Sequence, residues 1–171
     1  AARAATEHLL RLGRRRIAAI GAQSDGPNET ALLRLDGYRD ALKRAGIAVD
    51  EGLVLTVDTY SRAAGAEAAH RLLDSGQDFD AVFAFNDPLA LGAMHVLVTA
   101  GIRVPEDAAI IGFDGTEEAR YSTPSLSSVS PDMSALVSTA LDLAGGETPT
   151  PGIHTIDFTV VGRASTEGSA P

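Results

Sequence analysis

The sequence predicts an α/β protein in which a parallel sheet is covered by helices on both faces. Two observations carry this prediction. Short apolar segments alternate along the chain with longer amphipathic segments, and the short segments are continuous apolar runs, which is typical of strands that are buried on both sides. Strands joined by helices form right-handed βαβ units. We therefore expect a three-layer α/β/α arrangement with the flavodoxin-like strand order 2-1-3-4-5.

The ends of the expected helices are marked by punctuation residues. Glycine follows four of them, where helices commonly terminate. Asp87 followed by Pro88 predicts a helix start, with Asp87 as N-cap and Pro88 at the first helical position. The alternation weakens after residue 115, residues 145–152 form a Gly/Pro/Thr-rich connector, and the tail beyond Arg163 is expected to fray. In chain order we expect helix 1–12, strand 17–21, helix 30–45, strand 53–57, helix 61–75, strand 81–85, helix 87–101, strand 108–113, strand 126–130, helix 131–144 and strand 153–161.

The composition is that of an ordinary globular domain. Of its 171 residues, 44% are hydrophobic and 22% charged, and it has no cysteine, which excludes disulfides and thiolate metal sites. No apolar run reaches the roughly 18 residues that span a membrane, and no signal sequence is recognisable at the start. We therefore expect a cytoplasmic protein without membrane contacts, while a signal peptide that has been removed stays an open possibility.

The charge of the chain argues against direct binding to DNA. The net charge is −9 and the isoelectric point lies near 4.8, whereas binding to duplex DNA needs clustered cations. One basic cluster comprises Arg11, Arg14, Arg15 and Arg16. Its simplest explanation is a helix C-terminus whose dipole is complemented by positive charge.

Polar residues that follow the strands are the candidates for a ligand site, because parallel sheets bind ligands at the carboxyl ends of their strands. Carboxylates and amides bind paired hydroxyls, arginine donates a fork of hydrogen bonds, and tyrosine covers an apolar sugar face. The set that follows the strands contains all of these groups, which suit a polyhydroxylated small molecule. The candidate effector-binding residues are Asn28, Thr30, Arg34, Tyr60, Asn86, Asp87 and Asp114.

Each candidate also has a purely structural explanation. Asp87 can serve only as an N-cap, and Asn86 and Asp114 can simply close turns. Tyr60 and Arg34 can be ordinary surface residues. The expected convergence of these residues at one end of the sheet favours the binding interpretation.

Signatures of catalysis are missing from the sequence. No nucleophile elbow, phosphate-binding loop or dinucleotide fingerprint follows any expected strand, and the four histidines have no metal-ligand spacing. We therefore expect no catalytic residues, metal or cofactor. An α/β enzyme of flavodoxin-like topology is the least favoured class of function.

The expected helix 87–101 is apolar around its whole circumference. Leu89, Ala93, Val96, Leu97 and Ala100 form the face expected to pack on the sheet. A helix that is also apolar on its opposite face is covered on both sides, and the simplest cover is the two-fold mate of a homodimer. The expected interface residues on this helix are Leu91, Met94, His95 and Val98.

Three stretches of the sequence resemble the LacI/GalR family of bacterial regulators. They are HLLRLGRRRIAAIG at 8–21, AVFAFNDPLALGAMHVLVTAGIRVPEDAAIIGFDG at 81–115 and RYSTPSLSSVSPD at 120–132. Arg14 stands where the family usually has histidine. With RLDGYRDAL at 34–42, the likeness covers nearly the whole chain.

The resemblance implies one lobe of a two-lobed, periplasmic-binding-protein-like effector domain, whose upstream helix-turn-helix domain would bind operator DNA. It implies that 1–125 form the C-terminal lobe, 126–152 a crossover strand and helix of the N-terminal lobe, 153–163 the return strand, and 164–171 a tail. The family's effector contacts fall on Arg34, Asn86 and Asp114, with Tyr60 at the aromatic position and Asn28 and Thr30 in the preceding loop. Because Asn28 stands where some purine-sensing members have arginine, a sugar is favoured over a nucleobase.

The resemblance also implies that the segment around Tyr121 joins the dimer interface. The predicted function is therefore an effector-binding and dimerisation module of a transcriptional regulator, in which the ligand changes the lobe arrangement and thereby operator binding. The alternative is a periplasmic sugar-binding protein of a transport system, which would share the fold; the stretch 120–132 favours the regulator.

Overall fold

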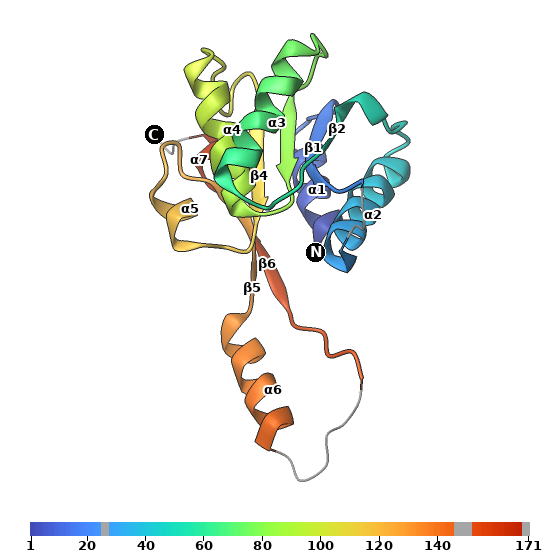
Figure 1. The fold of residues 1–171 in the computed structure, drawn as a ribbon, viewed down its shortest axis with the longest axis vertical. Helices are drawn as coiled ribbons and strands as arrows, with labels where there is room; N and C mark the ends of the chain where they lie inside the picture. The colour runs from blue at the N-terminus through green and yellow to red at the C-terminus, as the bar shows by residue number, and fades with distance from the viewer. Residues whose placement is uncertain (25–27, 146–151, 169–171) are drawn as a thin grey trace.

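The computed structural model describes residues 1–24, 28–145 and 152–168. Most of the Gly/Pro/Thr-rich connector and the last three residues of the tail lie outside the described residues. A six-stranded sheet with the order β2-β1-β3-β4-β5-β6 forms the centre of the molecule (Figure 1). The strands are β1 (Ile17–Ala22), β2 (Val54–Thr56), β3 (Ala81–Ala84), β4 (Ala109–Phe113), β5 (Ser127–Pro131) and β6 (Phe158–Val161).

The first five strands are parallel, which confirms the predicted strand order. The connections from β1 to β2 and from β2 to β3 run in opposite directions along the sheet, so right-handed crossovers place their helices on opposite faces. Accordingly α1 packs beside α2, and α3 packs beside α4. The helices are α1 (Ala2–Arg11), α2 (Glu29–Arg44), α3 (Arg62–Asp74), α4 (Asp87–Thr99), α5 (Glu117–Tyr121), α6 (Met133–Gly145) and α7 (Ala164–Glu167), with a 3-10 turn at Glu51–Leu53 before β2.

The core lies between the sheet and these two helix layers. Every residue of β1 and β3 is buried, as continuous apolar runs require. Phe83 is fully buried, and its ring centroid lies 5.3 Å from that of Phe85. The hydroxyl of the buried Tyr38 on α2 donates to the Ile17 carbonyl at 2.8 Å, so that the phenol keeps a partner.

The final strand is shorter than predicted and antiparallel. We expected a strand over 153–161, but only Phe158–Val161 pairs with β5. Phe158 is paired with Pro131, which is the last residue of β5. Residues before Phe158 therefore have no strand beside them, because the partner chain has already turned into α6.

The expectation that the tail frays after Arg163 is wrong for residues 164–168. Ser165 and Thr166 are buried in the short helix α7. The Ser165 hydroxyl accepts from the Ser127 N–H at 2.8 Å and donates to the Ile110 carbonyl at 2.6 Å. These bonds anchor α7 to the sheet, and hydroxyl side chains alone gave no periodic signal that would predict them.

Helix α6 lies away from the sheet, at the end of the arm formed by β5 and β6 (Figure 1). Its apolar stripe is not covered by the chain's own core: Met133, Leu136, Val137 and Leu141 are between 42% and 67% exposed. The family resemblance assigns this helix to the other, N-terminal lobe. No helix in the described parts of the chain is long and apolar enough to cross a membrane.

Candidate effector-binding site

Arg34 on α2 reaches across the carboxyl edge of the sheet to β3 and β4. Its guanidinium donates to the Asp114 carboxylate at 3.1 Å and to the Phe85 carbonyl. It also lies over the Phe113 ring, with 3.9 Å from the guanidinium carbon to the ring centroid, a cation–π arrangement. The Arg34 side chain is only 14% exposed. Arg34 and Asp114 thus share one edge of the sheet, as the strand-end argument required.

Asp114 adopts a backbone conformation that is unusual for a residue with a side chain. Its φ angle is 108°, in the region that favours glycine, and such strain of roughly 1–3 kcal/mol tends to be retained at functional positions. Burial raises the pKa of the Asp114 carboxyl, and the Arg34 guanidinium opposes that rise. The side chain keeps 41% of its surface exposed. Asp114 therefore combines a fixed position, a paired charge and access to a ligand.

Tyr60 and Asn86 complete the same edge. The Tyr60 hydroxyl donates to the Gly21 carbonyl at 2.9 Å, and the Asn86 amide donates to the Tyr60 carbonyl at 3.2 Å. The Asn86 Oδ1 accepts from the Leu89 N–H at 2.9 Å and so caps α4. The Asn86 amide has the capacity for further hydrogen bonds beyond these two. Burial raises the pKa of Tyr60, against the opposing charge of Arg34.

The two loop candidates lie at the start of α2. Asn28 is the N-cap, and its side chain accepts from the Ala31 N–H at 2.8 Å. Thr30 is exposed and lines a surface hollow with Leu33, Arg34 and Phe113. This hollow opens beside the Arg34–Asp114 pair, so Thr30 borders the candidate site.

The structure places Asp87 differently from the sequence-based expectation. The N-cap of α4 is Asn86, not Asp87, and Asp87 is the first helical residue, so the predicted capping role is wrong by one position. Asp87 is fully buried, and its carboxylate accepts from the Thr116 N–H and the Ser128 hydroxyl. It points into the protein because the N–H and hydroxyl donors that satisfy its charge lie there. Asp87 therefore lies behind the candidate site rather than on its surface.

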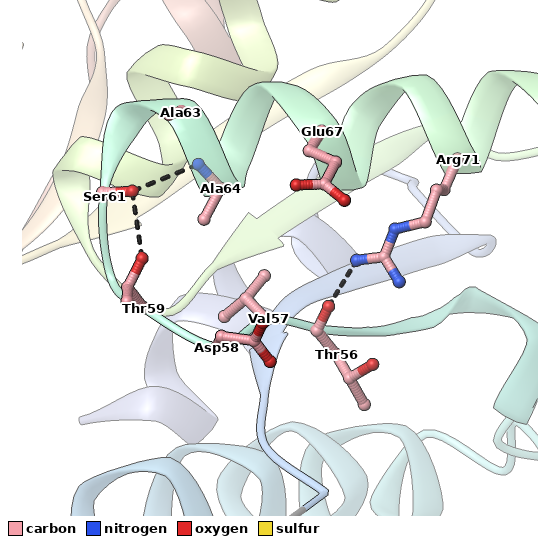
Figure 2. A pocket seen from close by; sticks show the side chains of 9 residues that line it. All are labelled: Thr56, Val57, Asp58, Thr59, Ser61, Ala63, Ala64, Glu67 and Arg71. Atoms are coloured by element: carbon pink, nitrogen blue, oxygen red, sulfur yellow. Dashed lines mark hydrogen bonds between the residues drawn. The ribbon is translucent and has the colours of Figure 1, made fainter.

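Another hollow lies between β2 and α3 and does not include these candidates (Figure 2). Polar side chains line it, among them Asp58, Glu67 and Arg71, and the Arg71 guanidinium donates to the Thr56 carbonyl. Asp58, Glu67 and Arg71 are exposed. The hollow contains no buried polar group aimed at a ligand, so the edge around Arg34 and Asp114 remains the better candidate. Within residues 1–24, 28–145 and 152–168, no cluster of three acidic, cysteine or histidine side chains could hold a metal ion.

The predicted interface residues form one surface on α4 and α5. Val98 is 45% and Tyr121 72% exposed, and His95 is also exposed. Met94, which the helical wheel placed on the outer face, is only 4% exposed, and it lies against a hollow that Ser122 and Thr123 also line. The hollow on this surface is lined by Leu91, Met94, His95, Val98, Thr99, Ser122 and Thr123.

Sequence reasoning missed one residue at the site. Phe113, the last residue of β4, supports the guanidinium of Arg34. It directly precedes Asp114, so reading one position further back from each strand end would have found it. In the basic cluster at 11–16, the Arg15 guanidinium donates to the Leu10 carbonyl near the end of α1, as the helix-dipole explanation predicted. Arg14 and Arg16 instead donate to the carbonyls of Pro105 and Asp78, far away in sequence.

Comparisons with known proteins place the chain in a family. Residues 6–166 match the model of the periplasmic binding protein-like domain. The chain is 44% identical over 128 residues to the HTH-type transcriptional regulator CelR of Thermobifida fusca, a match that covers 74% of this chain and 36% of that regulator. The chain thus spans about a third of the length of the curated relatives it matches.

Two solved structures share the fold and hold a sugar. A complex of the transcriptional regulator CelR with cellobiose has a TM-score of 0.85 at 36% identity, with 96% of this chain and 50% of that chain covered. A LacI-family transcriptional regulator from Enterococcus faecium with bound ribose has a TM-score of 0.83 at 29% identity, with 96% and 61% covered.

Proposed function

Because the chain belongs to the periplasmic-binding-protein-like domains of LacI-family transcriptional regulators, we propose that it is the effector-binding and dimerisation module of such a regulator. The observation that carries this proposal is the Arg34–Asp114 pair at the carboxyl edge of the sheet, flanked by Asn86 and Tyr60. Binding sites in open α/β sheets lie at this edge. In the full-length regulator, operator DNA would be bound by a helix-turn-helix domain outside the residues of this chain.

The effector that fits this edge is a sugar or sugar derivative. A carboxylate, an amide and a guanidinium can bind neighbouring hydroxyls, while Tyr60 and Phe113 offer aromatic surface. The Arg34 guanidinium is already paired with the Asp114 carboxylate and bonded to the Phe85 carbonyl, so Arg34 does not offer a free cation to an acidic ligand. The sugars bound in the two related structures support the same class. The effector contacts on this lobe would be Arg34, Asn86 and Asp114, with Tyr60, Asn28 and Thr30 around them.

The arm of the molecule supports the proposed division into lobes. Residues 1–125 and the return strand 153–163 would belong to the C-terminal lobe, and 126–152 to the crossover into the N-terminal lobe. The exposed stripe of α6 is the observation that favours this boundary, since an apolar stripe of this kind needs cover. Ligand bound between the lobes would stabilise one lobe arrangement and change operator binding.

The homodimer would form through α4 and α5. These helices present a mostly apolar surface that can pair with its own two-fold copy. It comprises the exposed Val98, His95 and Tyr121, together with Leu91 and the small exposed part of Met94. A regulator of operator DNA acts in the cytoplasm without membrane contacts, and we propose that location. Regulation by binding, with no catalytic step, accounts for the site.

The experiment that tests the proposed function uses the full-length protein. Its melting temperature is measured with a panel of mono- and disaccharides that includes ribose and cellobiose, and the stabilising sugar is then tested in DNA-binding assays. A sugar that raises the melting temperature and changes DNA affinity supports the regulator. Sugar binding without any DNA binding would instead support the alternative, a sugar-binding protein of a transport system.

A further inference from the structure

The buried carboxylate of Asp87 joins two segments that are remote in sequence. One oxygen accepts from the Thr116 backbone N–H at 2.7 Å, and the other accepts from the Ser128 hydroxyl at 2.6 Å. Asp87 has no exposed surface, so both bonds are shielded from water. Hydrogen bonds to an ionised acceptor are about twice as strong as neutral ones. If either segment moved away, the buried carboxylate would lose a hydrogen-bond donor, which is unfavourable for a charge that water cannot reach.

The two segments have different places in the proposed mechanism. Thr116 belongs to the turn that carries Asp114, at the effector edge. Ser128 belongs to β5, whose chain continues into the arm and α6 (Figure 1). The Ser128 hydroxyl also accepts from the Gly115 N–H at 3.0 Å. Asp87 thus stands between the turn that would meet the ligand and the strand that would lead to the other lobe.

The chain packs closely near this carboxylate. A Cβ atom added at Gly112 would lie 2.3 Å from the Asp87 carboxylate, and one added at Gly115 would lie 2.5 Å from the Ser130 hydroxyl. Closely packed interiors transmit small displacements instead of absorbing them. A shift of the turn at 114–116 is therefore passed to β5 and not taken up by a cavity between them.

We propose that Asp87 is a positioning residue that couples ligand binding at Asp114 to the orientation of β5 and α6. This inference rests on the proposed function. The carboxylate holds the turn and the strand in one shared arrangement, so a ligand that favours one position of the turn also favours one position of the arm. Coupling of this kind is a free energy shared by two sites, and it weakens when the element that connects them is loosened.

The test compares Asp87→Asn with Asp80→Asn in the full-length regulator. Asp80 is the control, because its carboxylate also accepts two hydrogen bonds, in this case from the backbone N–H groups of Arg15 at 2.7 Å and Arg16 at 3.0 Å, at the opposite end of β3. The DNA is a fragment selected in vitro for tight binding to the wild-type protein. The sugar is the one from the panel above that stabilises the wild type most. The measured quantity is the ratio of the larger to the smaller of the two DNA dissociation constants measured with and without that sugar, so that it exceeds one whichever way the sugar acts.

We expect Asp87→Asn to reduce this ratio by about tenfold while the affinity for the sugar alone changes by less than about threefold. Asp80→Asn should lose stability and keep the wild-type ratio. Ser128→Ala is the second variant should Asp87→Asn fail to fold, and it should reduce the ratio by a smaller factor, which Ser128→Thr restores by keeping the hydroxyl.

Three results would overturn the inference. An unchanged ratio in Asp87→Asn and Ser128→Ala would make Asp87 a structural residue only. Equal losses in Asp87→Asn and Asp80→Asn would reflect general destabilisation. If no sugar of the panel changed the DNA affinity of the wild-type protein, the proposed function would be contradicted, and this inference with it. This result differs from the first two because it is seen in the wild type and not only in the variants.

Discussion

Helices α4 and α6 have the same length and a similar apolar content, but opposite surroundings. Each has 13 residues. Eight residues of α4 are buried, whereas four large apolar side chains of α6 are between 42% and 67% exposed. An apolar stripe therefore shows that a helix needs cover, and topology decides whether the cover comes from the same lobe. For α4 the sheet lies alongside, while the strands of the arm carry α6 beyond the end of the sheet.

The first prediction is that truncating a core side chain beside α4 and truncating a side chain of α6 differ strongly in their effect on stability. Phe83→Ala removes a fully buried ring from β3 and should lower the free energy of unfolding by about 3–5 kcal/mol. Leu141→Ala truncates a side chain of α6 that is 67% exposed, and it should change the free energy of unfolding by less than about 0.5 kcal/mol. Denaturant unfolding of this chain by itself measures both. A loss for Leu141→Ala close to that for Phe83→Ala would mean that α6 packs into this lobe in solution.

The contrast also shows what the sequence could and could not predict. Continuous apolar runs such as 81–85 predicted the parallel strands, because burial on both faces leaves a strong pattern, and the flavodoxin-like topology of such βαβ units predicted their order. Ser165 and Thr166 left no such pattern, and their anchoring of α7 depends on donors and acceptors far away in sequence. The end of β6 depends on where β5 stops, which a single segment does not encode.

At the candidate site, the sequence predicted position better than role. Strand-end reasoning brought Arg34, Asn86 and Asp114 to one edge because the carboxyl ends of parallel strands must meet there. It could not separate Asn86 from Asp87 as the N-cap, since both residue types cap helices well. It also could not see that the Asp87 side chain turns inward, because the donors at Thr116 and Ser128 come from later in the chain.

The second prediction asks which of the two helices mediates self-association. Val98→Lys puts a charge into the outer face of α4, close to the helix C-terminus where a cation is tolerated, and should weaken dimerisation by about 2–4 kcal/mol. Leu141→Lys on α6 is the matched control and should leave the dimer of the full-length protein largely intact. Sedimentation equilibrium of both variants gives the dimer dissociation constants. Dissociation by Leu141→Lys alone would move the interface to α6.

The third prediction concerns the ligand edge of the lobe that contains α4. Asp114→Ala should weaken binding of the stabilising sugar to the full-length protein by about 1–3 kcal/mol, because ligand hydroxyls lose a charged acceptor and Arg34 loses its partner. Asp58→Ala changes an exposed acid of the hollow between β2 and α3 and should leave affinity unchanged. Isothermal titration calorimetry measures both. Equal losses in the two variants would place the ligand outside the candidate site.

The fourth prediction concerns the contact between α1 and α7, the short helix that follows β6, and its effect on stability is expected to be small. His8 on α1 is buried and lies 3.0 Å from the Thr166 hydroxyl of α7, which follows β6. Burial lowers the pKa of His8 below its ordinary 6.5, with Glu167 opposing this effect and Arg11 adding to it. The unfolded chain therefore binds the proton more tightly than the folded one. Stability should be complete above about pH 6.5 and should fall as the pH drops through the interval below that value.

His8→Gln keeps a hydrogen-bonding group near Thr166 but cannot titrate in this range. Between about pH 7.5 and about pH 5.5, the wild type should lose no more than about 2–4 °C of melting temperature beyond the loss in His8→Gln, and this difference should have the stated sign. The same scan with His70→Gln, an exposed histidine of α3, should match the wild type. If the wild type and His8→Gln lose equal stability, the contact between α1 and α7 opens before the domain unfolds, and both ends of the arm, not only α6, are loosely attached to the body.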